Sequence, residues 1–299
     1  MKRFARDRSR RVRSPGRSRL QRPTIVLDKS YLQGASGQEV SALCDSCNTL
    51  VTEDLVFELL TGDLETRTKC FRKLPQRENP AGIIAHPGTL MRYEVENRHP
   101  ATPVWDHRMT GTFTFNEGLA AGDFKLTEEQ ADGVREWEGN LAEDVEGFLQ
   151  EVSTAERISP PLDGLRPGAS PERVEEICQR IASDAEMIRA LYASFAPKGF
   201  PPPPIVGRTW VVFRRVQAHL LACVEYFARF GVGVNPAHRG RLENERIDVN
   251  YLVLALLAQG LATRDRDMQR RFRRLCPDGI LIDTPEDLGQ LQQPLEKPR

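Results

Sequence analysis

The sequence predicts an α/β fold: a three-layer α/β/α sandwich with a central parallel sheet, carrying a large, mainly helical insertion. Three observations predict it. Residues Thr24–Leu27 form a short apolar run that ends at Asp28, a pattern typical of a buried strand with a carboxylate at its carboxyl end. Residues 261–288 alternate strand and helix patterns at a spacing that predicts parallel pairing through crossovers. Between these regions, residues 97–205 carry mainly helical patterns.

The part of the chain that follows Asp28 is expected to add helices and a second strand. Apolar spacing predicts helices over Gln38–Leu43 and Leu50–Leu60, and a basic helix over Leu64–Leu74. Residues 82–86 are expected to form the second strand. Residues 23–96 would therefore make up the first part of the sandwich.

Long helical patterns fill the middle of the chain. Residues 127–152 and 171–195 each carry an aromatic and aliphatic stripe at helical spacing, which we interpret as core. Ser170 and Pro171 give the second of these helices an N-cap and a proline at its first position. The proline run at 201–204 is expected to act as a stiff linker, so the insertion is placed at 97–205.

Residues 206–299 are predicted to return to the sandwich. A third apolar helix is expected over Trp210–Phe230. Asp248 is placed at the start of a helix over Val249–Gln259, where a carboxylate suits the helix dipole, with Gly260 as its C-cap. Strands at 261–263 and 279–282 would flank a basic helix, and a short helix opens at residue 284.

Charge is segregated along the chain. Basic and acidic residues both total 42, yet residues 1–22 carry ten basic residues and one acid, which leaves a net charge of −9 on the remainder. This Arg- and Ser-rich arm has too little apolar content to fold alone, so it is predicted to be disordered. It could bind phosphates through counterion release, be a solvated tail, or be an organelle transit peptide.

Cysteine usage and hydropathy favour the cytoplasm. The six cysteines are spread over the chain rather than arranged as a disulfide framework, which indicates a reducing compartment. No secretory signal is visible, and the longest apolar run, Tyr251–Ala258, is too short to span a membrane. Cys44 and Cys47 form a single CxxC, which favours two helix-associated thiols over a zinc or redox site.

Four acids lie where strand ends and helices could bring them together: Asp28, Glu58, Asp248 and Asp265. Glu58 is flanked by apolar residues on both sides, with Glu53 and Asp54 as alternatives to it. Crowded carboxylates repel one another, and a hard divalent cation with oxygen ligands relieves this repulsion. The alternative is that these are ordinary surface acids.

The motifs around these acids resemble those of the PIN-domain nucleases. They are Leu-Asp-x-Ser-x-Leu at 27–32, Phe-Glu-Leu-Leu at 57–60, Ile-Asp-x-x-Tyr-Leu at 247–252 and Thr-x-Asp-x-Asp-Met at 263–268. The resemblance covers residues 23–96 and 240–290 and implies a parallel α/β/α sandwich whose acids converge on Mg²⁺ or Mn²⁺. The chain departs from the compact family pattern in that 190 positions separate Glu58 from Asp248.

The resemblance implies a metal-dependent nuclease that hydrolyses phosphodiester bonds, with RNA favoured over DNA as the substrate, and the cysteine usage places it in the cytoplasm. Asp28, Asp248 and Asp265 would hold the metal, with Asp267 able to replace Asp265, while Glu58 would orient water or a second ion. Ser30 and Thr263 would support the ligands through hydrogen bonds. Nucleic acid would contact arginines on the basic helix between the last two strands and just before it: Arg264, Arg266, Arg270, Arg271 and Arg274.

Partners follow from the same interpretation. Nucleic acid is the expected partner, and the family resemblance favours RNA. A regulatory protein could bind the helical insertion, and no membrane partner is expected. Two alternatives stay open at this point. The chain could be a noncatalytic nucleic-acid-binding or scaffolding protein that keeps the fold, or a toxin-type ribonuclease that a partner restrains.

Overall fold

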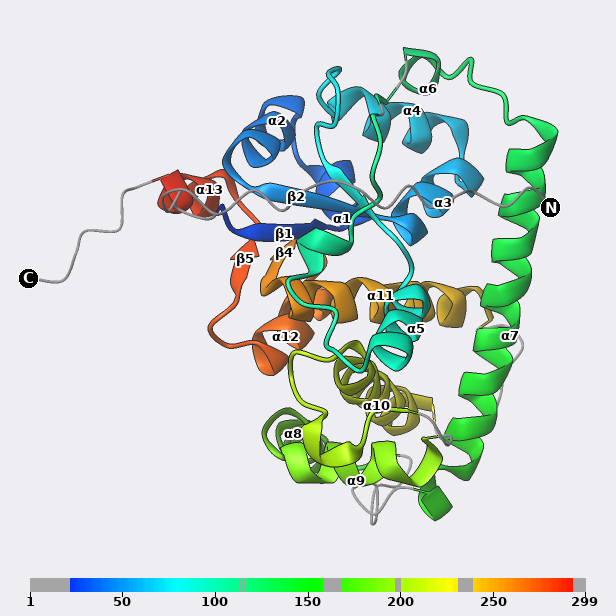
Figure 1. Ribbon diagram of the computed structural model, residues 1–299, viewed down its shortest axis with the longest axis vertical. Coiled ribbons are helices and arrows are strands. Elements are labelled where there is room, and N and C mark those ends of the chain that lie inside the picture. The colour runs from blue at the N-terminus through cyan, green and yellow to red at the C-terminus, as the bar shows by residue number, and fades with distance from the viewer. Residues whose placement is uncertain are drawn as a thin grey trace, which may run out of the picture.

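A five-stranded, all-parallel sheet forms the centre of the computed structural model, which describes residues 22–112, 114–115, 117–158, 168–196, 200–230 and 239–292. The strand order is β3-β2-β1-β4-β5 (Figure 1). The strands are β1 (Thr24–Leu27), β2 (Asn48–Thr52), β3 (Gly82–Ile84), β4 (Gly260–Ala262) and β5 (Ile280–Ile282). The predicted α/β class with a parallel sheet is therefore confirmed.

The side on which successive strands are added to the sheet changes at β1. The chain adds β2 and then β3 on one side of β1, and β4 and β5 are added on the other side. In the register of β1 with β4, Val26 lies opposite Leu261 and Leu27 lies opposite Ala262. The two ends of the sequence thus meet in the middle of the sheet, as the prediction of an insertion between two docked parts requires.

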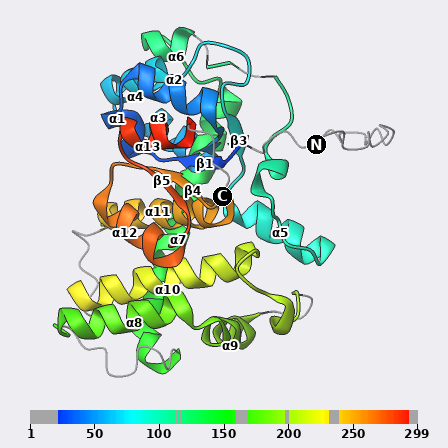
Figure 2. The same cartoon turned by 90° about the vertical axis from the view of Figure 1, so that its left-hand side faces the viewer.

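Helices cover both faces of the sheet (Figures 1 and 2). The side of α1 (Lys29–Gly34) and α2 (Gly37–Ser46) also carries α3 (Glu53–Thr61), α4 (Leu64–Lys73) and α13 (Pro285–Gln292). The opposite side carries α11 (Arg239–Ala258) and α12 (Arg266–Leu275). One continuous core of buried apolar side chains runs from Ile25 through the sheet and into the helices beyond it.

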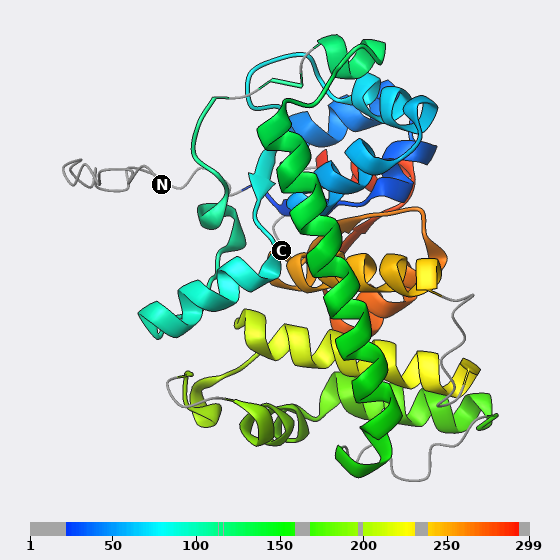
Figure 3. The same ribbon diagram turned by 90° about the vertical axis from the view of Figure 1, so that its right-hand side faces the viewer.

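A further helical layer packs beyond α11. It contains α10 (Val211–Phe230), α8 (Pro171–Ser183) and α9 (Ala185–Phe195). The long helix α7 (Glu128–Ile158) runs along the side of the molecule, from the sheet region to this further helical layer (Figure 3). The remaining described helices are α5 (Pro87–Asn97), α6 (Glu117–Ala121) and the 3-10 turns η1 (Val104–His107) and η3 (Pro203–Ile205).

Four local predictions were wrong. Residues 48–52 form β2, so the helix expected from Leu50 begins only at Glu53, after Thr52 caps it by accepting from Leu55 N–H at 2.9 Å. The helix expected over 171–195 breaks at Asp184, which caps α9 by accepting from Met187 N–H. The helix expected from Val249 already begins at Arg239.

The fourth correction concerns Gly260, which is the first residue of β4 and not a helix C-cap. A Cβ at this position would lie 2.3 Å from the Thr24 carbonyl oxygen and 2.5 Å from Ile25 Cδ1. Only glycine lets β4 lie this close to β1. The residue before it, Gln259, takes the positive φ of 58° instead.

Two further predictions concern the basic arm and the absence of a membrane-spanning segment. The basic arm lies outside the described residues except for Arg22, so its predicted disorder stays a prediction. Within the described ranges, no helix is both long and apolar enough to cross a membrane.

Candidate functional site

Asp28 stands at the carboxyl end of β1 and is held by hydroxyl groups from both ends of the chain. Its Oδ2 accepts hydrogen bonds from Ser30 Oγ at 2.5 Å and from Thr263 Oγ1 at 2.6 Å. The two hydroxyls also lie 2.9 Å apart. The Asp28 backbone N–H donates to the Ala262 carbonyl at 3.0 Å. The structure thus brings Ser30 and Thr263 onto Asp28 as the sequence predicts.

The pKa of the Asp28 carboxyl is affected by burial and by nearby acids. Burial, with 5% of the residue exposed, raises the pKa of the Asp28 carboxyl, and the two hydroxyl hydrogen bonds counter part of this rise. The negative charges of Glu58 and Asp265 raise that pKa further. Two of the predicted acids are therefore close enough to Asp28 for their charges to repel.

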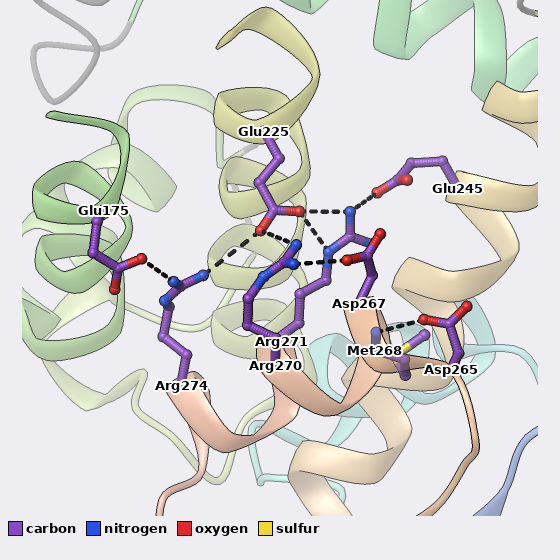
Figure 4. Close-up of polar contacts among 9 residues, drawn as sticks. All are labelled: Glu175, Glu225, Glu245, Asp265, Asp267, Met268, Arg270, Arg271 and Arg274. Atoms are coloured by element: carbon purple, nitrogen blue, oxygen red, sulfur yellow. Dashed lines mark hydrogen bonds and ion pairs between the residues drawn. The ribbon is translucent and has the colours of Figure 1, made fainter. Parts of the chain in front are cut away.

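Asp265 begins α12 at the same edge of the sheet. Its Oδ1 accepts from Met268 N–H at 2.8 Å, which caps the helix, and its own N–H contacts Ser30 Oγ and Thr263 Oγ1, each at 3.1 Å. Figure 4 shows the Asp265 carboxylate apart from that of Asp267, which pairs with Arg270 at 2.7 Å. Asp265 is therefore tied to the Asp28 cluster, while Asp267 faces an arginine.

Asp248 approaches this cluster from α11. Because α11 begins at Arg239, Asp248 lies in the interior of the helix and not at its start, so a helix-dipole role is wrong for it. Burial raises the pKa of Asp248 well above its ordinary value, and the charges of Asp28 and Asp265 contribute to this rise. Asp28, Asp248 and Asp265 consequently form one electrostatically coupled group.

Glu58 on α3 has two partners of its own. Lys29 Nζ lies 2.7 Å from Oε1, and the Tyr251 hydroxyl donates to Oε2 at 3.0 Å. Sequence reasoning missed both partners. Their positions carry a signal, because Lys29 directly follows Asp28 and Tyr251 lies one helical turn after Asp248.

The two alternatives to Glu58 have other contacts. Glu53 Oε2 accepts from the His86 N–H at 3.0 Å, and Asp54 Oδ1 accepts from Trp137 Nε1 at 3.2 Å. His86 follows β3, and its Nε2 lies 2.9 Å from Asn250 Nδ2 on α11. Burial lowers the pKa of the His86 imidazole to about 4. These side chains build a second buried polar cluster, which the sequence did not reveal.

The arginines predicted to bind nucleic acid differ in their surroundings (Figure 4). Arg271 is buried between Glu225 on α10 and Glu245 on α11, with contacts of 2.6 Å to each. Arg274, with 9% of its side chain exposed, pairs with Glu175 on α8 and reaches Glu225 at 3.6 Å. The phosphate-binding role predicted for Arg271 and Arg274 stays a prediction, and the structure holds both guanidinium groups inside ion pairs that a phosphate would have to displace.

The other three arginines stay nearer to solvent. Arg270 is 46% exposed, although it pairs with Asp267 and Glu225. Arg264 is partly exposed and binds Glu39 at 2.8 Å, while Arg266 is exposed. Of the five predicted arginines, these three are the ones that a phosphate could reach from solvent.

Cys44 and Cys47 are buried at the end of α2. Burial raises the pKa of each thiol to about 11, so both are protonated at neutral pH. This matches the interpretation of helix-associated thiols.

The acids fit a divalent metal by charge and by donor type. Asp28 is buried and Asp248 is partly buried, and their two carboxylates repel each other, the situation that a hard cation relieves. In the described part of the chain, however, no three His, Cys, Asp or Glu side chains are grouped closely enough to hold a metal ion. Binding a metal would therefore require these side chains to close around it.

Comparison with protein-family models, with curated proteins and with solved structures gave no match for this chain.

Proposed function

We propose that the chain is a metal-dependent nuclease with a PIN-like fold, acting on RNA in preference to DNA. The position of Asp28 carries this proposal. The strand order reverses between β1 and β4, and ligands of open α/β sheets bind at the carboxyl ends of the strands beside such a switch point. Asp28 and Thr263 follow these two strands and are hydrogen-bonded to each other.

In this proposal Asp28, Asp248 and Asp265 hold one Mg²⁺ or Mn²⁺ ion. The ion would lower the pKa of a bound water and neutralise charge that develops on the phosphate. Ser30 and Thr263 keep the Asp28 carboxylate oriented, and the Asp265 N–H contacts to both hydroxyls fix the start of α12 beside it. The chain itself thus supplies ligands and their orientation.

An acidic site needs basic surface around it before it can bind a polyanion. Arg266 and Arg270 are exposed near the site, Arg270 in ion pairs with Asp267 and Glu225, and the ten basic residues of the arm add a larger positive charge. These groups would offset the negative charge of the body.

The test is cleavage of labelled single-stranded RNA and DNA by the purified chain in Mn²⁺, Mg²⁺ or EDTA. Asp28→Asn and Asp265→Asn should each lower metal-dependent cleavage by about 100-fold or more, because each removes a charged ligand. Asn also caps helices, so Asp265→Asn should leave α12 folded. Asp63 caps α4 in the same way through Thr66 N–H, so Asp63→Asn is the matched control and should cut normally.

Each outcome separates the hypotheses. Cleavage that needs metal and disappears in both site variants, with unchanged thermal stability, supports the proposal and identifies the polymer. Cleavage that persists in both variants contradicts it. A wild-type chain that neither cuts nor binds Mn²⁺ would favour a noncatalytic nucleic-acid-binding or scaffolding protein.

A further inference from the structure

The Glu58 carboxylate has a cation on one oxygen and a hydroxyl donor on the other. Lys29 Nζ is 2.7 Å from Oε1 and Tyr251 Oη is 3.0 Å from Oε2. The Lys29 and Glu58 side chains are only 24% and 18% exposed, and Tyr251 is fully buried. Partial burial strengthens such a pair relative to an ion pair on the open surface.

This contact joins three helices that lie beside the candidate acids. Lys29 is the first residue of α1 and directly follows Asp28. Glu58 belongs to α3, and Tyr251 belongs to α11 three positions after Asp248. The ammonium group therefore brings one positive charge to the acidic edge of the sheet.

A second divalent ion at Glu58 would have to displace this ammonium group. It would lose the attraction of Glu58 to Lys29 and would also be repelled by the nearby lysine charge. A single ion on the three aspartates leaves the Lys29–Glu58 pair intact and meets only the repulsion, because none of the three is ion-paired to Lys29 among the described contacts.

We propose that the Lys29 ammonium group takes the place of a second metal ion, so that this site binds one divalent cation and Glu58 holds Lys29 rather than metal. The inference rests on the proposed function and deepens it. It replaces the expectation that Glu58 orients water or a second ion.

The experiment is calorimetric titration of the full-length chain with Mn²⁺. The wild type should bind one ion. Lys29→Gln removes the charge and frees Glu58, so this variant should bind two ions or bind the first on the order of tenfold more tightly. Lys29→Arg keeps the charge and should behave as the wild type does.

Lys125→Gln, which removes a charge from an exposed position after α6, is the matched control and should also bind one ion. Thermal unfolding of each variant shows whether it is folded. If Lys29→Gln does not fold, the number of ions bound by the wild type and by Lys29→Arg still tests the inference.

The outcomes distinguish this inference from the proposed function. Two ions on the wild type overturn the inference and leave the nuclease proposal standing. One ion on both wild type and Lys29→Gln, with equal affinity, also overturns it, because Lys29 then excludes nothing. No Mn²⁺ binding by the wild type overturns the inference and the metal-dependent function together.

Discussion

Asp54 shows how the structure fixes the behaviour of a single carboxylate outside the candidate metal ligands. It lies in the first turn of α3, is 1% exposed, and accepts a hydrogen bond from Trp137 Nε1 on α7. Trp137 in turn stacks on Phe57 with ring centroids 5.4 Å apart. Burial raises the pKa of Asp54 from 3.8 to about 6, so folding favours the protonated acid.

The raised pKa predicts a pH-dependent stability. The stabilisation is fully present below pH 3.8 and is lost as the pH rises through about 6. Asp54→Asn cannot ionise, so its free energy of unfolding relative to the wild type should increase by about 2 kcal/mol between pH 4 and 7. Urea unfolding across this range measures it. The exposed Asp278→Asn is the control, and an equal pH profile for Asp54→Asn and wild type would contradict the prediction.

At the scale of elements, the basic helix α12 turns Arg271 and Arg274 toward protein and keeps Arg266, Arg270 and Arg273 exposed. Arg271 neutralises Glu225 and Glu245, which belong to two different helices (Figure 4). Burial alone would lower the pKa of Arg271, but the charges of Glu245 and Glu225 raise it above its ordinary value. The ion pairs thus join α12 to α10 and α11.

Removing this arginine should therefore affect stability and not RNA affinity. Arg271→Met leaves two partly buried carboxylates without their main cation and should cost about 2 kcal/mol of unfolding free energy. Arg273→Met, an exposed change on the same helix, should stay within about 0.5 kcal/mol of the wild type. Chemical unfolding and RNA titration of both variants provide the measurement. Weaker RNA binding by a fully stable Arg271→Met would refute the packing role.

Local sequence patterns predicted part of this fold but not the ion pairs of α12. The strand before Asp28 and the strands and helices that close the chain follow from apolar spacing, and parallel pairing follows from their alternation. The approach of Thr263 to Asp28 was expected from the resemblance to PIN-domain nucleases. The burial of Arg271 depends on Glu225, 46 positions away on α10, and no local pattern gives the placement of α10 against α12.

Short-range signals also competed with one another. Residues 48–52 precede a strong helix start at Thr52, so the short strand was absorbed into the predicted helix. Asp248 follows polar residues that resemble a helix start, yet α11 already runs through them because Leu242, Ile247 and Val249 are buried by neighbouring helices. Tertiary packing thus overrode the local boundary signals.

For the whole molecule, the distribution of charge separates an arm from a folded body. Among the described residues, every member of the buried core lies at or after Ile25, so deleting residues 2–21 leaves each of these core side chains in place. The deletion does remove nine basic residues and one acid. The remaining body is acidic, and its candidate site is acidic as well.

Deleting residues 2–21 should weaken RNA binding by about tenfold or more at low salt, and the dependence of affinity on salt concentration should become shallower, because fewer counterions are released. Thermal stability and the cleavage rate at saturating RNA should not change, since the described core and the proposed metal ligands all lie after the deleted residues. Replacing the eight arginines of residues 3–19 with lysine is the matched control, as it keeps the charge and should keep the salt dependence. Fluorescence anisotropy over a salt series measures both quantities. An unchanged salt dependence in the deleted chain would place the phosphate contacts on the body instead, on exposed residues such as Arg266.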